Sequence, residues 1–392
     1  MNWGKRKLTD VCEIQPSKSQ AKELHDKNIN VSFMPMNSLG IQSKNALTGI
    51  EKKLGSVYKA YTYFSENDVL LAKITPCFEN GKLGIARGLT NGIGFGSSEF
   101  IVLRSGEQLS CEYLYYYLRR AKFIEEGRSN MSGAVGHKRV TAQFIANYQI
   151  PMPPLQEQKR IAAILDQAEE LKQKRQRSLE LIDELKQAIF IDMFGDPDTN
   201  PHNFQRKKLG EIINFVGGSQ PSKANFVYEH NEGLVRLVQI RDFKSDKNIV
   251  YVPAHLAKRP FSTEDIMIGR YGPPVFQILR GLSGTYNVAL MKAEPIDDIS
   301  KEFIYYLLKE PRLHNFVVAN SERTAGQSGV NLKLLNEYPA YLPPKDVQTK
   351  FDAKIANVSK LEESIIQSSH LSEELFTSLQ HKAFSGELSG TA

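Results

Sequence analysis

Two long stretches without glycine or proline constrain this chain more than any other feature. The first, residues 157–194, follows Pro153-Pro154 and stops at a Phe-Gly pair. The second follows Pro343-Pro344 and stops at Phe-Ser-Gly. Proline ahead of such a stretch and glycine after it are typical start and stop signals of a helix. Each stretch therefore predicts one long helix, and at ~1.5 Å per residue the first would measure roughly 57 Å.

Apolar residues recur along both stretches with a helical spacing. The first carries Ile161, Ile164, Ala168, Leu171, Ile182, Leu185 and Ile189, at alternating steps of three and four once Arg175 and Ser178 are counted in the series. The second carries Phe351, Ile355, Val358, Leu361, Ile365, Leu375, Leu379 and Ala383. This spacing is a heptad seam, which needs a partner helix. Because one chain supplies two such seams, we expect an antiparallel coiled coil whose length sets the separation of the domains beside it.

The helices belong to an internal repeat. Tyr115-Tyr116 matches Tyr305-Tyr306 and Phe194 matches Phe384, each at an offset of 190 residues. Alternating apolar patterns precede each helix, as expected for strands followed by a short helix. The predicted fold is therefore mixed α/β (α+β) with a pseudo-two-fold repeat. Its parts are a first domain over residues 1–152, a central helix over 153–196, a second domain over 197–342 and a C-terminal helix over 343–392.

Composition limits the function classes only broadly. The chain has 392 residues, a formal charge of +6 and 41% apolar residues, which suits a folded protein and allows a polyanionic partner without requiring one. Three cysteines without a CxxC pair argue against a disulfide framework and a zinc site. The sequence shows no signal segment and no apolar run of ~18 residues, so we expect a cytoplasmic protein with no membrane partner.

Motifs of catalysis and cofactor binding are missing or incomplete. Gly92, Gly94 and Gly96 form GxGxG, but the strand pattern SSEFIVLR follows where a phosphate-binding helix would have to begin. Tyr271 to Val275, YGPPV, lacks both ends of the Pro-Pro motif of amino-methyltransferases. No GxxxxGK[ST] or HExxH occurs, and the histidines show no ligand spacing. We therefore expect no enzyme, no bound cofactor and no metal.

Polar loops between the expected strands carry the side chains that base edges and phosphates require. Two similar domains held apart by long helices also suit an extended partner such as a DNA duplex. Ordinary strand-connecting turns have a similar composition, so both interpretations stay open at this point. The predicted DNA-contacting residues are Lys73, Thr75, Asn80, Lys82, Arg87, His137, Lys138 and Arg139 in the first domain, and Gln239, Arg241, Arg270, Tyr271, Gln277, Arg280, Gln327 and Ser328 in the second.

Several segments resemble the specificity subunit of Type I restriction-modification enzymes. They are PPLQEQKRIAAILD and AIFIDMFGDP of the central helix, its degenerate copy LQHKAFSGEL, and the loops LLAKITPCFENGK and GRYGPPVFQILRG. The resemblance covers essentially the whole chain. It implies two target-recognition domains that each read half of a bipartite sequence in double-stranded DNA, and helices that set the spacer and dock two methyltransferase subunits. It also implies a non-catalytic chain, with S-adenosylmethionine, ATP and Mg²⁺ bound by the methyltransferase and restriction subunits.

On this resemblance, the helices supply the surface for the partner subunits. The predicted partner-binding residues are Leu155, Gln158, Ile161, Ile164, Leu165, Phe190, Phe194, Phe351 and Phe384. The second helix departs from the pattern, with Lys345-Asp346 in place of Leu155-Gln156, so equal affinity at two docking surfaces is not implied. Two alternatives are a coiled-coil adaptor that binds only proteins, and a self-sufficient methyltransferase or nuclease, which the missing motifs oppose.

Overall fold

The computed structural model describes residues 3–24, 28–41, 43–46, 49–134, 136–197, 199–324 and 327–388. The chain forms two compact units. The first unit comprises Met1–Gln176 together with Gln367–Ala392, and the second comprises Arg177–Ile366. Each unit therefore contains one β-rich region, half of one long helix and half of the other.

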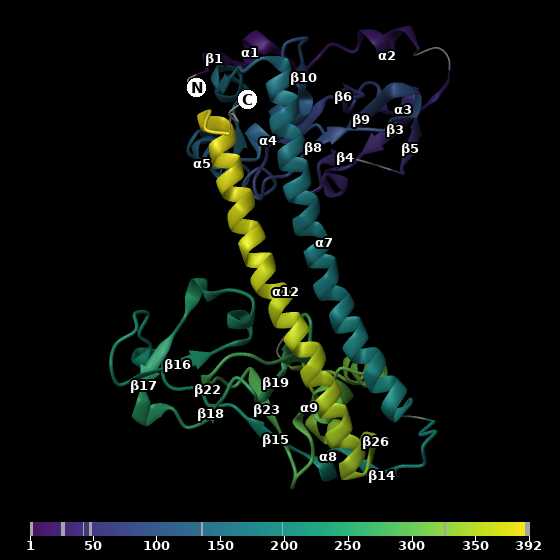
Figure 1. Ribbon diagram of the computed structural model, residues 1–392, viewed down its shortest axis with the longest axis vertical. Coiled ribbons are helices and arrows are strands. Elements are labelled where there is room, and N and C mark those ends of the chain that lie inside the picture. The colour runs from purple at the N-terminus through teal and green to yellow at the C-terminus, as the bar shows by residue number, and fades with distance from the viewer. Residues whose placement is uncertain are drawn as a thin grey trace. The chain divides into compact units, whose positions relative to one another are not determined.

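Two main sheets and a cluster of short helices build the first unit (Figure 1). The five-stranded sheet has the order β2 (Cys12–Ile14), β10 (Phe100–Ser105), β7 (Val69–Ala72), β8 (Leu83–Ala86) and β4 (Asn45–Ala46). The four-stranded sheet has the order β5 (Glu51–Lys53), β3 (Asn30–Met34), β9 (Ile93–Gly96) and β6 (Thr62–Ser65). Two strand pairs complete it, β1 (Lys5–Lys7) with β13 (Gln149–Pro151) and β11 (Met131–Ser132) with β12 (Arg139–Val140). Its short helices are α1 (Leu8–Val11), α2 (Ser19–Glu23), α3 (Leu54–Val57), α4 (Cys111–Leu118), α5 (Ala121–Ser129) and α6 (Ala142–Asn147), with 3-10 turns η2 (Met36–Ser38) and η3 (Thr90–Gly92).

The second unit repeats this plan. One sheet has the order β15 (Ile213–Gly217), β23 (Leu290–Pro295), β19 (Ile266–Gly269) and β21 (Gln277–Leu279). The other has the order β17 (Tyr251–Pro253), β16 (Leu234–Val238), β22 (Gly284–Tyr286) and β18 (Pro260–Phe261). Smaller sheets pair β14 (Gln205–Lys208) with β26 (Pro339–Leu342), and β20 (Tyr271–Gly272) with β25 (Gln327–Gly329) and β24 (Glu322–Thr324). The helices are α8 (Leu209–Ile212), α9 (Lys301–Leu308), α10 (Pro311–Ala319) and α11 (Leu332–Glu337), with 3-10 turns η4 (Lys223–Asn225), η5 (Ile240–Phe243), η6 (Asp246–Asn248) and η7 (Ala254–Leu256).

The glycines of the GxGxG motif are part of strand β9. A Cβ on Gly94 would lie 2.0 Å from the ring of Phe64, and one on Gly96 would lie 2.5 Å from the carbonyl oxygen of Met34. Glycine at these positions therefore lets neighbouring strands and a buried ring approach closely. The strand predicted from SSEFIVLR, where a phosphate-binding helix would have to begin, is confirmed as β10.

The two long helices are α7 (Leu155–Phe194) and α12 (Lys345–Ser385), and they pack together (Figure 1). In the first unit, Lys172 of α7 pairs with Glu373 of α12 at 2.6 Å. In the second unit, the rings of Phe194 and Phe351 lie 5.0 Å apart. The N-terminal half of α7 thus meets the C-terminal half of α12, and the converse holds in the other unit. The predicted antiparallel pair of helices and the mixed α/β fold are confirmed.

The predicted heptad seam is wrong in several positions. Leu171 and Leu375 are 39% and 48% exposed in the first unit, and Leu185 and Leu361 are 46% and 54% exposed in the second. Polar residues are buried on the same helices instead, among them Glu169 and Lys186. The globular part of each unit also packs on the long helices. The buried face of each helix is therefore set by the globular part as well as by the partner helix.

An aromatic helix joins the sheet to α7 in each unit. In the first, Tyr113, Tyr115 and Tyr116 of α4 are at most 1% exposed and share a core with Ile161 and Leu165 of α7. In the second, α9 contributes Phe303 and Tyr306 to a core that includes Phe190, Phe194 and Phe351. None of the helices in the described ranges combines the length and apolar character needed to cross a membrane.

Candidate nucleic-acid interface

Two polar segments of the first unit that are far apart in the sequence form one surface. Ile74, just after β7, makes an isolated antiparallel bridge with Arg139 of β12. Around it, the amide of Thr75 donates to the carbonyl of Lys138, and the amide of Val140 donates to the carbonyl of Lys73, both at 2.9 Å. Strand pairing therefore brings the predicted residues near 73 and near 138 together.

Polar side chains line this surface. The hydroxyl of Thr75 donates to the carbonyl of Gly136 at 3.2 Å and accepts from the amide of Lys138 at 3.1 Å. Lys73 is half-buried, whereas Asn80, His137 and Lys138 are exposed. We call Lys73, Thr75, Asn80, His137, Lys138 and Arg139 the first polar surface.

A carboxylate that the sequence analysis missed lies within the first polar surface. Glu99, at the start of the segment leading into β10, accepts two hydrogen bonds from the guanidinium of Arg139, from Nε at 2.9 Å and from Nη2 at 2.7 Å. The hydrogen bond from Arg139 lowers the pKa of Glu99, and the charges of Arg139 and Lys73 lower it further. The carboxylate is therefore ionised at neutral pH. Only the fold could reveal this contact, because 40 residues separate the two partners.

The second unit uses the same backbone arrangement. β20 pairs with β25, placing Tyr271 opposite Gly329, and the amide of Val330 donates to the carbonyl of Arg270 at 3.0 Å. Arg270 and Tyr271 are half-buried, and the guanidinium carbon of Arg270 lies 5.5 Å from the Tyr271 ring centroid. The side chains of Gln327 and Ser328 lie outside the described part of the structure. The predicted residues Arg270 and Tyr271 thus occupy the place of Lys73 and Ile74.

Residues Gln239, Arg241 and Gln277 lie in other parts of the second unit. The amide of Gln239 donates to Asp242 at 2.9 Å, and Arg241 beside it is exposed. Gln277, in β21, donates through Nε2 to the carbonyl of Pro274 at 2.9 Å, which places it beside the loop that follows Tyr271. The sequence analysis placed all three residues in one polar set, whereas the structure places Gln239 and Arg241 directly after β16 and Gln277 in β21.

Three predicted contacts to DNA are occupied by the protein itself. Lys82 donates through Nζ to the carbonyl of Met36 at 2.9 Å. Arg87 is ion-paired with Glu112 of α4, and Arg280 with Glu302 of α9 at 2.6 Å. Both arginines therefore fasten a strand region to the first turn of the aromatic helix, where a carboxylate is favourable. The side chains of Arg87 and Arg280 are 30% and 19% exposed, against 45% for the ion-paired Arg139. We therefore remove Lys82, Arg87 and Arg280 from the candidate interface and keep Arg139.

Most of the predicted partner-binding residues are buried in the chain's own cores. Ile161, Leu165, Phe190, Phe194 and Phe351 are 0% exposed. Ile164 and Phe384 are half-buried. A buried side chain offers no surface to a second protein, so these residues stabilise the units instead. Leu155, at 37% exposure, is the member of the set that is available at the surface.

Gln158 was also predicted at the partner surface, but it is 0% exposed. Its Oε1 accepts from the amide of Ser110 at 2.9 Å, and its Nε2 donates to the carbonyls of Gln108 and Pro153, both at 2.9 Å. Gln348 repeats this arrangement in the second unit with Ser300 and Pro343, both at 2.8 Å. These amides link the start of each long helix to the start of the aromatic helix.

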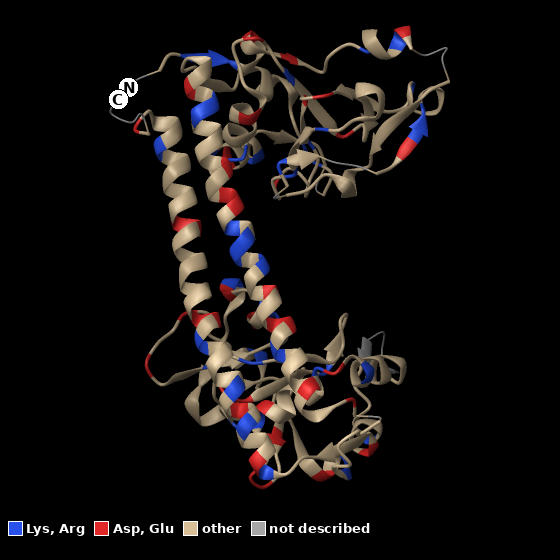
Figure 2. Cartoon of the chain, turned by 45° about the vertical axis from the view of Figure 1, so that its right-hand side comes forward, with Lys and Arg blue, Asp and Glu red and all other residues tan. Residues whose placement is uncertain are grey.

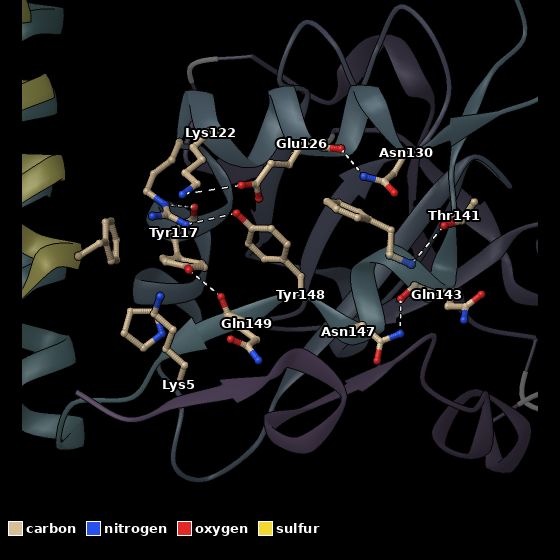
Figure 3. Close-up of a pocket in the computed structure, with 14 residues that line it drawn as sticks. Lys5, Tyr117, Lys122, Glu126, Asn130, Thr141, Gln143, Asn147, Tyr148 and Gln149 are labelled. Atoms are coloured by element: carbon tan, nitrogen blue, oxygen red, sulfur yellow. Dashed lines mark hydrogen bonds and ion pairs between the residues drawn. The ribbon is translucent and has the colours of Figure 1, made fainter. Parts of the chain in front are cut away.

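A polar hollow of about 590 Å³ lies in the first unit among α5, α6, β13 and the end of α12 (Figure 3). Tyr148 projects into it, and its hydroxyl accepts from Nη2 of Arg120 at 3.4 Å. The guanidinium of Arg120 also lies 3.5 Å from the centroid of the Tyr117 ring. Among the residues that the structure describes, no three His, Cys, Asp or Glu side chains gather as metal ligands.

Comparison with known proteins shows which proteins the N-terminal part of the chain is similar to. Residues 1–181 match the family model for the Type I restriction modification DNA specificity domain. The specificity subunit of the Type I restriction enzyme EcoAI from Escherichia coli is 38% identical over 189 residues, which are 48% of this chain and 31% of that protein. The N-terminal part of the chain is therefore similar to the Type I specificity domain. The chain spans about a third of the length of the E. coli relatives that it matches.

Other comparisons extend over the whole chain. A putative Type I restriction enzyme MjaX specificity subunit from Methanocaldococcus jannaschii is 21% identical, with 92% of this chain and 87% of that protein covered. A chain from a structure on complex assembly and conformational transition of the type I R-M system has a TM-score of 0.59 at 19% identity, with 99% and 98% covered. The S subunit from M. genitalium has a TM-score of 0.54 at 16% identity, with 98% and 96% covered. The two structures share the fold of this chain.

Proposed function

We propose that this chain is the non-catalytic specificity subunit of a Type I restriction-modification complex. It reads a bipartite target in double-stranded DNA, with residues 1–152 reading one half and residues 197–342 the other. The helices over 153–196 and 343–392 set the spacer and dock two methyltransferase subunits, with which the restriction subunits assemble. S-adenosylmethionine, ATP and Mg²⁺ belong to those subunits, and the complex works in the cytoplasm.

One observation carries this proposal: the same strand frame occurs twice and presents different side chains. Val140 donates to the carbonyl of Lys73, and Val330 donates to the carbonyl of Arg270. Lys73 and Thr75 of the first frame correspond to Arg270 and Gly272 of the second. Specificity depends on contacts to base edges. Two units that read different short sequences therefore need the same backbone arrangement with different polar side chains.

The charges of the chain are mixed in sign, which suits contacts to DNA made by individual side chains. The formal charge is +6 over 392 residues, and Figure 2 shows cationic and anionic residues interspersed along α7. The proposal therefore does not depend on α7 carrying a continuous acidic or basic face. The interface consists of the first polar surface and of Gln239, Arg241, Arg270, Tyr271 and Gln277 in the second unit. Partner docking is assigned to exposed positions of the helices, beginning with Leu155.

The test is a gel shift with a pool of random duplexes, the purified chain and its methyltransferase subunits. The complex should retain DNA and, after repeated selection and sequencing, yield two short motifs with a fixed gap. The same methyltransferase subunits without the chain are the control and should select no motif. If the chain binds the methyltransferase but changes nothing in DNA selection, it is a protein-binding adaptor and the proposal is wrong.

A further inference from the structure

We propose that Arg139 reads a guanine in the half-site of the first unit, and that Glu99 positions Arg139 for that contact. The inference rests on the proposed function, since it concerns DNA bound at the first polar surface. Beyond the proposed function, the inference names the base as guanine, the recognition residue as Arg139 and the positioning residue as Glu99.

The donors of Arg139 can be counted. A guanidinium has five N–H groups. Nε and one N–H of Nη2 bind the two carboxylate oxygens of Glu99, and one N–H of Nη1 donates to the carbonyl of His137 at 3.3 Å. Within the described residues, two N–H groups of Arg139 remain without a hydrogen bond, one on each terminal nitrogen. A guanine offers two neighbouring acceptors, O6 and N7, in the major groove, and two N–H groups of one arginine match them.

The backbone of Arg139 is fixed from two sides. It pairs with Ser132 in the β11–β12 ladder and with Ile74 after β7. Glu99 is tied to the same frame, because its carbonyl accepts from the amide of Lys73 at 2.9 Å. Arg139 therefore lies on a paired strand and Glu99 in the turn directly before β10, while the Arg139 side chain is 45% exposed and accessible to a large partner. Such support is what a recognition contact needs in order to be precise.

Stability alone gives little reason for this pair. An exposed ion pair contributes little to folding, because solvent screens its charges and ordering two long side chains costs entropy. Its geometric effect is larger, because two parallel hydrogen bonds fix the plane of the guanidinium and hence the direction of its remaining donors. Without Glu99, the arginine would be free to turn toward a phosphate, which carries no sequence information.

The second unit has the same frame without this pair. The amide of Arg270 donates to the carbonyl of Ala289 at 2.8 Å, as Lys73 does to Glu99. Gly329 lies opposite Tyr271, as Arg139 lies opposite Ile74. Ala289 and Gly329 thus replace both members of the pair. The two positions are therefore a point at which the specificities of the units diverge, and the guanine contact belongs to the first unit alone.

The experiment selects a random duplex pool with the chain in complex with its methyltransferase subunits. Wild type is compared with Arg139→Lys, which keeps the charge but loses the fork, and with Glu99→Gln. Arg160→Lys is the matched control, because Arg160 makes the same two-bond contact with Glu157 on α7. Thermal unfolding of each variant establishes that it is folded.

We expect the wild-type motif to contain a guanine that Arg139→Lys selects roughly 5- to 150-fold less strongly, while the other positions of both halves stay unchanged. Glu99→Gln should weaken the same position, and Arg160→Lys none. An unchanged motif in Arg139→Lys, or an equal loss at every position, would show a phosphate or structural contact and overturn the inference. A wild-type complex that selects no motif would instead contradict the proposed function.

Discussion

The side chain of Gln158 accepts a hydrogen bond from the backbone amide of Ser110 at 2.9 Å, with neither residue at the surface. Ser110 is the N-cap of α4, where its hydroxyl accepts from the amide of Tyr113. One glutamine near the start of α7 thereby fixes the start of the aromatic helix. The same relationship between Gln348 and Ser300 shows that it belongs to the repeated design of the two units.

Replacing Gln158 by alanine should destabilise the first unit by at least about 2 kcal/mol, because the amide of Ser110 and the carbonyls of Gln108 and Pro153 lose a buried partner. Urea unfolding of the chain measures the loss. Gln156→Ala, at an exposed position of the same helix, is the control and should change stability by less than about 0.5 kcal/mol. Equal effects of the two substitutions would contradict the role assigned to Gln158.

Arg119 and Glu169 form a buried ion pair between α4 and α7, at 2.7 Å with side chains 13% and 7% exposed. Arg119→Ala should cost about 3–5 kcal/mol, since it leaves the carboxylate buried without a partner. The double variant Arg119→Met/Glu169→Leu should recover most of that loss, because the uncompensated charge is gone. A double variant as unstable as the single one would show that the loss comes from packing and not from charge.

Glu310 of the second unit gives a pH-dependent prediction. Burial raises the pKa of its carboxyl, Asp196 adds to the increase, and the hydrogen bond from Gln187 and the charge of Arg312 oppose it. A carboxyl with a raised folded pKa costs stability as pH rises from its unfolded pKa through the folded one. Glu310→Gln should therefore stabilise the chain at pH 7, by about 1 kcal/mol.

The advantage of Glu310→Gln should shrink as the pH falls through the raised folded pKa toward about 4, and its charge-dependent part should be absent below that, where Glu310 is protonated in both states. Its new amide also offers a donor to Oε1 of Gln187, which has no hydrogen-bond partner among the described residues. Thermal unfolding between pH 3.5 and 7 measures the difference, with exposed Glu229→Gln as the control. A difference that does not depend on pH would show that the charge of Glu310 is not the cause.

Local signals in the sequence were enough to predict the helices and the repeat. Pro-Pro before each long helix and glycine after it depend on neighbouring residues alone, and the repeat follows from comparing the sequence with itself, as in the match of Phe194 with Phe384. The face that each helix buries was not predictable in this way. Leu185 is exposed and Lys186 buried because a globular region and Glu362 contact the helix there.

The candidate interface could be predicted in position but not in detail. Lys73 and Lys138 were both expected from loop composition, and strand pairing brings their segments together. Arg87 and Arg280 have the same composition signal, yet each is held by a carboxylate of the aromatic helix. Glu99 had no signal of its own. Whether an arginine or lysine side chain is available to DNA depends partly on ion pairs with residues far away in the sequence. Such pairs cannot be predicted from a local sequence pattern.

Insertions in α7 test whether the helices set the spacer. Four residues inserted after Arg177 would lengthen the helix by about 6 Å and turn it by about 40° beyond a full turn, so the spacer should grow by close to two base pairs. Two residues would rotate the helix by about 200° and should abolish methylation by breaking the packing. The measurement is the position of methylated adenines. An unchanged spacer in an active four-residue variant would contradict this role of α7.

The central claim is that each unit reads its own half of the target, and an exchange of one unit tests it most directly. Residues 1–152 are replaced by the matching segment of another family member, and methylated adenines are mapped by single-molecule sequencing in cells that carry the complex with its methyltransferase subunits. We predict that one half of the methylated sequence changes to that of the donor, while the other half keeps its bases. A change in both halves, or in neither, would contradict the account.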